Sequence, residues 1–168
     1  MFSGIPVELP AMLAAREERA ARQDAWLEKY DCPLLSFTLN IPGPVKTSPD
    51  LRCAFDAGLL ALEDALGAAG LSPTARTEIH APTGDEALLA IDGDAAAIKE
   101  IAARIEEEHP LGRLFDMDVL NADGTKLSRS VPRRCLLCTE QAQSCARSRR
   151  HSVAELTAEI ERLLAAYL

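Results

Sequence analysis

The chain has 168 residues, of which 48% are hydrophobic and 26% charged, and its formal net charge is −8. This composition is typical of one globular domain, and the acidic balance argues against a general nucleic-acid binder. No apolar run approaches the ~20 residues of a transmembrane helix, and the N-terminal sequence lacks the features of a signal peptide. We therefore expect a cytoplasmic protein with neither a nucleic-acid nor a membrane partner, whose cysteines stay reduced.

Helical and strand patterns alternate along the first half of the chain. A helix is expected over residues 8–30, and a strand follows over residues 34–41, where a Pro-Gly-Pro sequence ends it. A Ser-Pro pair at Ser48 is typical of a helix N-terminus. Apolar residues spaced three and four apart extend that helix to about Ala69.

The second half of the chain continues with strands and one long helix. Two strands, residues 74–81 and 86–92, are joined by a Pro-Thr-Gly-Asp turn, and a helix follows over residues 92–108. Residues 113–120 alternate as a strand does. The Asn-Ala-Asp-Gly turn after it predicts a short final strand at residues 125–128.

The β-α-β-β-α-β order of residues 34–128 predicts an α+β fold with a ferredoxin-like core, in which an antiparallel sheet carries two helices on one face. Residues 1–30 precede this core as an N-terminal helix. Residues 129–168 follow it as a Cys/Arg-rich segment, with a last helix at residues 153–167. We expect residues 1–168 to form a single domain.

Polar side chains interrupt the apolar face of the first helix. Arg16 and Gln23 fall in the middle of the apolar stripe, and Arg19 lies at its edge. An arginine in such a place can bury its stem and let its head reach water. We favour a ligand cavity instead, because an unpaired buried charge is costly and an anionic substrate would supply the acceptor.

The loop after the first strand carries Lys46 towards the N-terminus of the second helix. Backbone N–H groups and the helix dipole favour an anion at such a position. The loop alone is a weak signal, since Pro-Gly-Pro often does no more than end a strand and a lysine is usually solvated.

Asp116 and Asp118 lie two residues apart in a predicted strand, so their side chains share one face of the sheet. Carboxylates placed in this way can bind a divalent cation such as Mg²⁺. The alternation of the strand is equally compatible with two aspartates on a solvated face.

The segment from residue 129 to residue 150 reverses the overall charge. It holds a single acid, Glu140, and these arginines: Arg129, Arg133, Arg134, Arg147, Arg149 and Arg150. A local excess of positive charge can attract an anionic ligand or an acidic partner protein, or it can be a solvated surface.

Cysteines interleave with these arginines. The spacing of Cys135, Cys138, Cys145 and His151 is compatible with a tetrahedral Cys₃His site for structural Zn²⁺. The other interpretation is three reduced thiols and a histidine that precedes the last helix. A zinc-stabilised module that docks RNA or an acidic protein without catalysis is therefore a second candidate function. The acidic composition, the 4% aromatic content and the aspartate pair argue against it.

Four sequence blocks resemble the apo-citrate lyase phosphoribosyl-dephospho-CoA transferases, also called holo-acyl carrier protein synthases of citrate lyase. They are AREERAARQ (15–23), SFTLNIPGPVK (36–46), HPLGRLFDMDV (109–119) and RRCLLC…CARSRRHS (133–152). The resemblance implies a nucleotidyltransferase that uses 2'-(5''-triphosphoribosyl)-3'-dephospho-CoA. It implies transfer of the phosphoribosyl-dephospho-CoA group to a serine of the citrate lyase acyl carrier protein, with release of diphosphate.

This reaction needs cations for the substrate phosphates and a group that handles the serine proton. We expect Asp116 and Asp118 to hold Mg²⁺, and one of them or His109 to orient the serine or accept its proton. The expected substrate-binding residues are polar or cationic: Arg16, Arg19, Gln23, Asn40, Lys46, Arg113, Arg134, Arg147, Arg149 and Arg150. We expect one cleft, with the C-terminal arginines at its mouth, lined by Arg16, Gln23, Lys46, Arg113, Asp116 and Asp118.

Overall fold

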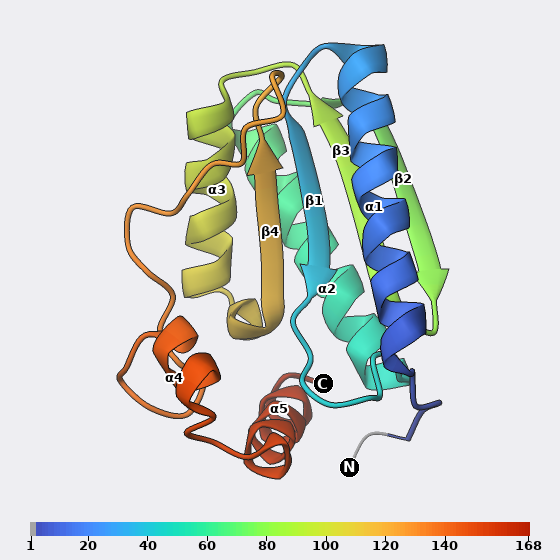
Figure 1. Cartoon of the computed structure of the whole chain (residues 1–168). Coiled ribbons are helices and arrows are strands. Elements are labelled where there is room, and N and C mark those ends of the chain that lie inside the picture. The colour runs from blue at the N-terminus through green and yellow to red at the C-terminus, as the bar shows by residue number, and fades with distance from the viewer. Residues whose placement is uncertain (1–2) are drawn as a thin grey trace.

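A computed structural model describes residues 3–168 and contains one four-stranded antiparallel sheet in the order β2-β3-β1-β4 (Figure 1). The strands are β1 (Leu34–Leu39), β2 (Pro73–Ala81), β3 (Gly84–Ile91) and β4 (Phe115–Leu120). The first strand along the chain therefore lies inside the sheet, between β3 and β4. The predicted α+β class is confirmed.

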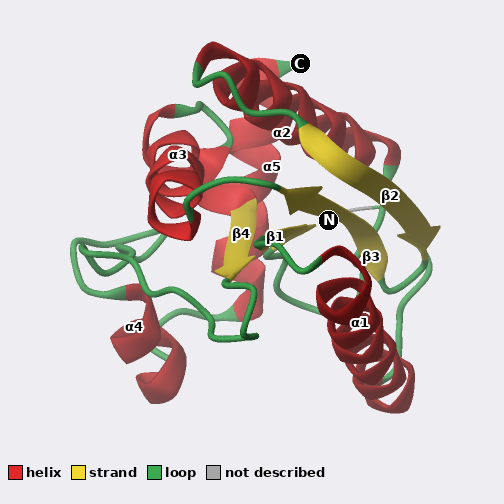
Figure 2. Cartoon of the chain, turned by 90° about the horizontal axis from the view of Figure 1, so that it is seen from above, coloured by secondary structure: helices red, strands yellow, loops and turns green. Residues whose placement is uncertain are grey.

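Helices cover both faces of this sheet. They are α1 (Leu9–Tyr30), α2 (Pro49–Ala68), α3 (Ala95–Glu108), α4 (Ala142–Ser148) and α5 (Val153–Tyr167), with a 3-10 turn, η1, at Gly112–Leu114. Seen from above, α2 and α3 lie on one side of the sheet and α1 lies on the other (Figure 2). Among residues 3–168, no helix combines the length and the apolar character needed to cross a membrane.

Local signals explain where several helices begin. The Ser48 side chain accepts a hydrogen bond from the Leu51 N–H at the start of α2, and Asp94 caps α3 in the same way. Ser152 and Glu155 form a reciprocal capping box at the start of α5. Each cap satisfies N–H groups that the helix itself leaves unpaired, which stabilises a helix by about 1 kcal/mol.

The main core lies between the sheet and the α2–α3 pair. Phe37 of β1 stacks on Phe55 of α2 with ring centroids 4.9 Å apart, and its edge meets Phe115 of β4 at 5.4 Å. Gly58 makes this contact possible, because a Cβ there would lie 2.6 Å from the Phe37 ring. A helix position with low helix propensity is thus required by the close approach of two aromatic rings.

The opposite face of the sheet is apolar at one end and polar at the other. At one end, Leu34, Leu88 and Ala90 pack under Trp26 and Leu27 of α1 in a small second apolar cluster. Towards the other end, polar side chains replace the apolar ones. Figure 1 shows that α1 lies over β3 and beside β1 on this face, whereas β4 has no helix over it. The aspartates of β4 therefore lie on the sheet face that faces α1, beyond the cover of that helix.

Several predicted boundaries were wrong. Residues 125–128 do not form a strand; Lys126 makes a single bridge to Leu120, and the chain then leaves the sheet edge. Beyond this point Arg129 contacts α3, where its guanidinium lies 2.9 Å from a Glu107 carboxylate oxygen.

Two other strand ends also differ from the prediction. The strand expected from Arg113 begins at Phe115, because η1 occupies the preceding residues. The strand expected to reach Ile41 ends at Leu39. The short helix α4 was not predicted, since its seven residues include no apolar periodicity that would mark a helix.

Candidate functional site

Three cavities adjoin at Asn40, the residue that follows β1. We name them after a residue that lines only one of them: the Arg16 cavity (about 140 Å³), the Asp118 cavity (about 670 Å³) and the Arg113 cavity (about 530 Å³). Asn40 lines all three. Asp116 lines the Arg16 and Asp118 cavities, whereas Arg133 lines the Asp118 and Arg113 cavities.

The two aspartates point to the same side of β4, as predicted. Asp116 pairs with Thr38 in the register of the sheet, and Asp118 pairs with Ser36. Asp118 has a direct cationic partner, since its Oδ2 lies 2.7 Å from Lys126 Nζ. Burial, and then the charge of Asp118, raise the pKa of Asp116 above its ordinary value. A carboxylate with a raised pKa is a better proton acceptor than an ordinary aspartate.

Arg133 faces Asp116 and is held there by a buried acid. Its Nη2 lies 2.8 Å from Glu106 Oε1 and 3.9 Å from Asp116 Oδ1. Glu106 is only 3% exposed and also accepts a 2.7 Å hydrogen bond from the Met117 N–H of β4. The Glu106 carboxylate thereby positions a guanidinium beside the aspartate pair.

Glu106 was not among the predicted site residues, although the sequence contained a signal for it. It belongs to the inward face of α3 that Ile98, Ala102 and Ile105 define. An acid on such a face needs a buried partner. Only the folded chain reveals that its partners are Arg133, at 2.8 Å, and Arg129, at 3.5 Å.

Lysines add to the positive charge around the aspartates. Lys99 is buried, donates a 2.9 Å hydrogen bond to the Met117 carbonyl, and lines the Asp118 cavity. Burial lowers its pKa. The Asp118 cavity therefore places carboxylates beside the cations Lys99, Lys126, Arg129 and Arg133.

The Arg16 cavity brings together the first helix and the loop after β1, as predicted. Arg16, Arg19 and Lys46 all line it, together with Asp116. Lys46 Nζ donates a 2.6 Å hydrogen bond to the Ile41 carbonyl, and burial and the nearby Arg16 charge lower its pKa. Arg19 is paired with Glu86 at 2.6 Å. Arg16 has no hydrogen-bond acceptor or ion-pair partner among residues 3–168, so its guanidinium is available to an anion.

The Arg113 cavity is lined by both apolar and cationic side chains. Leu114, Leu156 and Ile160 are among the apolar residues, and its cations are Arg113, Arg133, Arg134 and Arg149. Arg113 Nη2 donates hydrogen bonds to the backbone carbonyls of Arg134 and Cys135, the second at 2.5 Å. Burial and neighbouring cations lower the pKa of Arg113.

Other predicted residues are not brought to these cavities. Gln23 lies one helical turn beyond Arg19 and lines none of the three, and neither do Arg147 and Arg150. His109 follows α3, with its ring 4.9 Å from the ring of Phe115 and 5.4 Å from that of Tyr167. The single cleft expected from the sequence is thus a group of adjoining cavities that share Asn40, and two of them also share Asp116.

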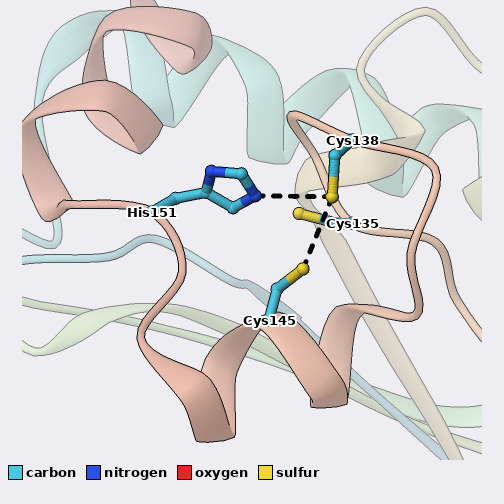
Figure 3. Close-up of side chains that lie close together, drawn as sticks. All are labelled: Cys135, Cys138, Cys145 and His151. Carbon is cyan, nitrogen blue, oxygen red and sulfur yellow. Dashed lines mark hydrogen bonds between the residues drawn. The ribbon is translucent and has the colours of Figure 1, made fainter.

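The cysteine constellation is brought together as predicted. Figure 3 shows the three thiols and the imidazole of His151 pointing towards a common centre. Their possible ligand atoms all lie within 4.8 Å of one another. Cys138 Sγ is 3.4 Å from Cys145 Sγ and 3.4 Å from His151 Nε2. Three sulfurs and one nitrogen at such separations form a donor set that can hold a metal ion.

Known proteins resemble this chain over nearly its whole length. Residues 7–167 match the family model described as apo-citrate lyase phosphoribosyl-dephospho-CoA transferase. A relative of that name from Citrobacter koseri is 43% identical over 162 residues, which cover 94% of this chain and 88% of the relative. A Vibrio cholerae protein, named as a probable member, is 42% identical over 95% of this chain and 92% of its own length. An Escherichia coli relative is 40% identical over 94% of this chain and 88% of its own length. The chain belongs to the apo-citrate lyase phosphoribosyl-dephospho-CoA transferase family.

Proposed function

We propose that this protein is a nucleotidyltransferase that attaches the prosthetic group of citrate lyase. It takes phosphoribosyl-dephospho-CoA from 2'-(5''-triphosphoribosyl)-3'-dephospho-CoA, transfers it to a serine of the acyl carrier protein subunit, and releases diphosphate. The names of the family and of its relatives support the transferase activity and the citrate lyase partner. The observation that carries the proposal is the position of Asp116 between cavities lined by Arg16, Lys46 and Arg133.

The arrangement supplies what such a transfer requires. The serine hydroxyl attacks the α-phosphorus, a new P–O bond forms, and the bond to the leaving diphosphate breaks. Asp116 accepts the serine proton, for which its raised pKa suits it. Arg16 and Lys46 bind phosphate oxygens, and Arg133 neutralises charge beside the reacting phosphorus. Positioning and charge neutralisation do most of the work in phosphoryl transfer, so the protein needs few other groups.

Asp116 and Asp118 also suit Mg²⁺, because two carboxylates on one strand face supply the oxygen ligands that this ion prefers. A bound Mg²⁺ would offset the negative charge of the substrate phosphates. Lys126, which now pairs with Asp118, would have to release that carboxylate. The Cys₃His cluster suits Zn²⁺ in a structural role, since four protein ligands leave no open position for a substrate.

We also propose a fold for the core, a cellular location and further substrate-binding residues. The order β2-β3-β1-β4 with alternating helices supports a ferredoxin-like core within a single domain, and we place the enzyme in the cytoplasm. Arg19, Asn40 and Arg113 line the cavities and are proposed substrate contacts, together with Arg134 and Arg149.

A direct assay tests the proposal. The purified chain is incubated with the triphosphoribosyl nucleotide and the apo-carrier subunit of citrate lyase, and the intact mass of the carrier is measured. We expect the carrier to gain one phosphoribosyl-dephospho-CoA group while diphosphate is released. A carrier whose acceptor serine is replaced by alanine is the control. A serine-containing carrier that stays unmodified in the presence of Mg²⁺ would contradict the proposed function.

A further inference from the structure

The segment that carries the arginines has little apolar packing of its own. Between residues 129 and 152 the described chain forms one helix of seven residues, and Val131 is 61% exposed. Local backbone hydrogen bonds join Cys135 to Glu140 and Ala142 to Arg133, at 2.7 and 2.9 Å. Such short-range bonds define a turn, but a segment with so small a core usually needs a further cross-link to hold one conformation.

The Cys₃His cluster lies where such a cross-link would act. Cys135 and Cys138 come from the turn before α4, Cys145 comes from α4, and His151 comes from the link to α5. Cys135 and Cys145 are buried, at 6% and 7% exposure. The four side chains thus join the turn, α4 and the link to α5 at one point.

The distances favour a metal ion over a disulfide. Cys138 Sγ and Cys145 Sγ are 3.4 Å apart, well beyond the ~2.05 Å of a sulfur–sulfur bond. Sulfur ligands at ~2.3 Å from a tetrahedral Zn²⁺ lie roughly 3.8 Å from each other, close to the separation seen. Three thiolates and one imidazole in a closed tetrahedral set select zinc among the common divalent ions.

The cluster shares its walls with the substrate cavities. Cys135, Cys145 and His151 line the Arg113 cavity as well as facing the centre of the cluster. Arg133, two residues before Cys135, is the guanidinium placed 3.9 Å from Asp116. Arg113 donates to the Cys135 carbonyl at 2.5 Å. An ion that fixed Cys135 would therefore fix both arginines relative to the aspartates.

We propose that these four side chains bind one Zn²⁺ ion, and that zinc occupancy governs anion binding in the adjoining cavities by positioning Arg113 and Arg133. The zinc-binding part of this proposal does not depend on the proposed function. The positioning part rests on the proposed function, because it assigns those arginines to a phosphate-bearing substrate. Loss of zinc then leaves the sheet folded and releases residues 133–152.

Metal analysis of the freshly reduced full chain tests whether the cluster binds zinc. We expect about one zinc per chain in the wild type, and retention of zinc in the control Cys53→Ser, which changes an exposed thiol of α2 outside the cluster. Cys138→Ser should lose zinc. His151→Cys should keep it, since four thiolates also bind zinc, whereas His151→Ala should weaken binding. Replacement by Co²⁺ should give the absorption bands of tetrahedral cobalt thiolate. Absence of stoichiometric zinc from the reduced wild type, or a Cys138–Cys145 disulfide found by mass spectrometry, would overturn the site.

Binding of inorganic triphosphate tests whether zinc positions Arg113 and Arg133, and this measurement does not require transfer to the carrier. We compare the zinc-loaded wild type with the same chain after chelation, and we follow amide hydrogen exchange in both. We expect affinity to fall roughly tenfold or more, as the loss of one charged hydrogen bond implies, and exchange to rise over residues 133–152 but not in the sheet. Equal affinity in the two forms would overturn the positioning role. Zinc-dependent triphosphate binding without transfer to the carrier would instead contradict the proposed reaction and leave the zinc inference intact.

Discussion

The layer between the sheet and the α2–α3 pair differs from residues 129–152 in what stabilises it. In the layer, Phe37, Phe55 and Phe115 are fully buried, and the Phe37 ring stacks on Phe55 and meets Phe115 edge to face. In the segment, Val131 and Leu137 are 61% and 36% exposed, Arg133 forms an ion pair with Glu106, and three cysteines gather with His151. This fold thus separates the residues that form its core from the residues proposed to bind anions. Asp116 lies on the boundary, on a strand of the first region and beside an arginine of the second.

Asp116→Asn should have the largest effect and should act on activity alone. Loss of the proton acceptor should reduce transfer to the carrier by roughly 100- to 10,000-fold, as for other general bases. The amide is nearly isosteric, so circular dichroism and the unfolding midpoint should stay close to those of the wild type. The measurement is the rate of carrier modification. Near-normal turnover would mean that Asp116 belongs only to a solvated strand face.

Phe37→Ala tests the other side of the comparison. We expect the free energy of unfolding to fall by about 3–5 kcal/mol, because the ring is fully buried between two others. Arg147→Ala is the matched change in the charged segment and should alter stability by less than about 0.5 kcal/mol. Urea unfolding measures both. Equal losses from the two substitutions would remove the distinction between the regions.

Arg16→Ala should weaken binding of the triphosphoribosyl nucleotide by about 1.5–3 kcal/mol, the value of one charged hydrogen bond. Arg16 lines the cavity shared with Asp116 and has no ion-pair partner among residues 3–168, so its loss should leave stability unchanged. Calorimetric titration gives the affinity. Arg104→Ala, at an exposed position on α3, is a suitable control. If the two variants bind equally well, Arg16 is not part of the substrate site.

The smallest effect concerns the pH dependence of stability. Burial in the folded state raises the pKa of Asp116, so folding disfavours the ionised carboxylate. The stability that the protonated carboxyl group contributes is therefore lost as the pH rises through the pKa of the folded state. Asp116→Asn should therefore be slightly more stable than the wild type at neutral pH. The difference should vanish below the ordinary aspartate pKa of about 3.9. Because the side chain is 46% exposed, solvent screens the effect and we expect less than about 0.5 kcal/mol. A wild type that is the more stable protein at neutral pH would contradict the direction.

Local patterns in the sequence predicted much of the fold. The apolar spacing of α2 and α3 and the cap at Ser48 predicted both helices closely, although α3 begins at Ala95 and not at residue 92. The alternation of residues 115–120 predicted β4 and the shared face of Asp116 and Asp118. The boundaries that failed, at η1 and at residues 125–128, depend on contacts with distant residues, such as the one between Arg129 and Glu107.

The sequence predicted only part of the candidate site. Composition and spacing identified Arg16, Lys46, the aspartates and the cysteine set as residues of interest. Their placement required the sheet order, which puts β1 beside β4 and so brings the Asn40 loop to Asp116. The roles of Glu106 and Arg133 depend on a pair 27 positions apart in the chain, and their 2.8 Å separation exists only after folding.

Local sequence patterns predicted most of the helices and strands, which side chains share a face, and which residue types are available for phosphate and metal. These properties follow from periodicity and capping, which act over a few residues. The tertiary structure decided which faces meet, which buried acid holds which arginine, and that three cavities adjoin at Asn40. Those outcomes depend on burial and on charge pairing between segments far apart in the chain, because a buried charge is stable only where the fold supplies its partner.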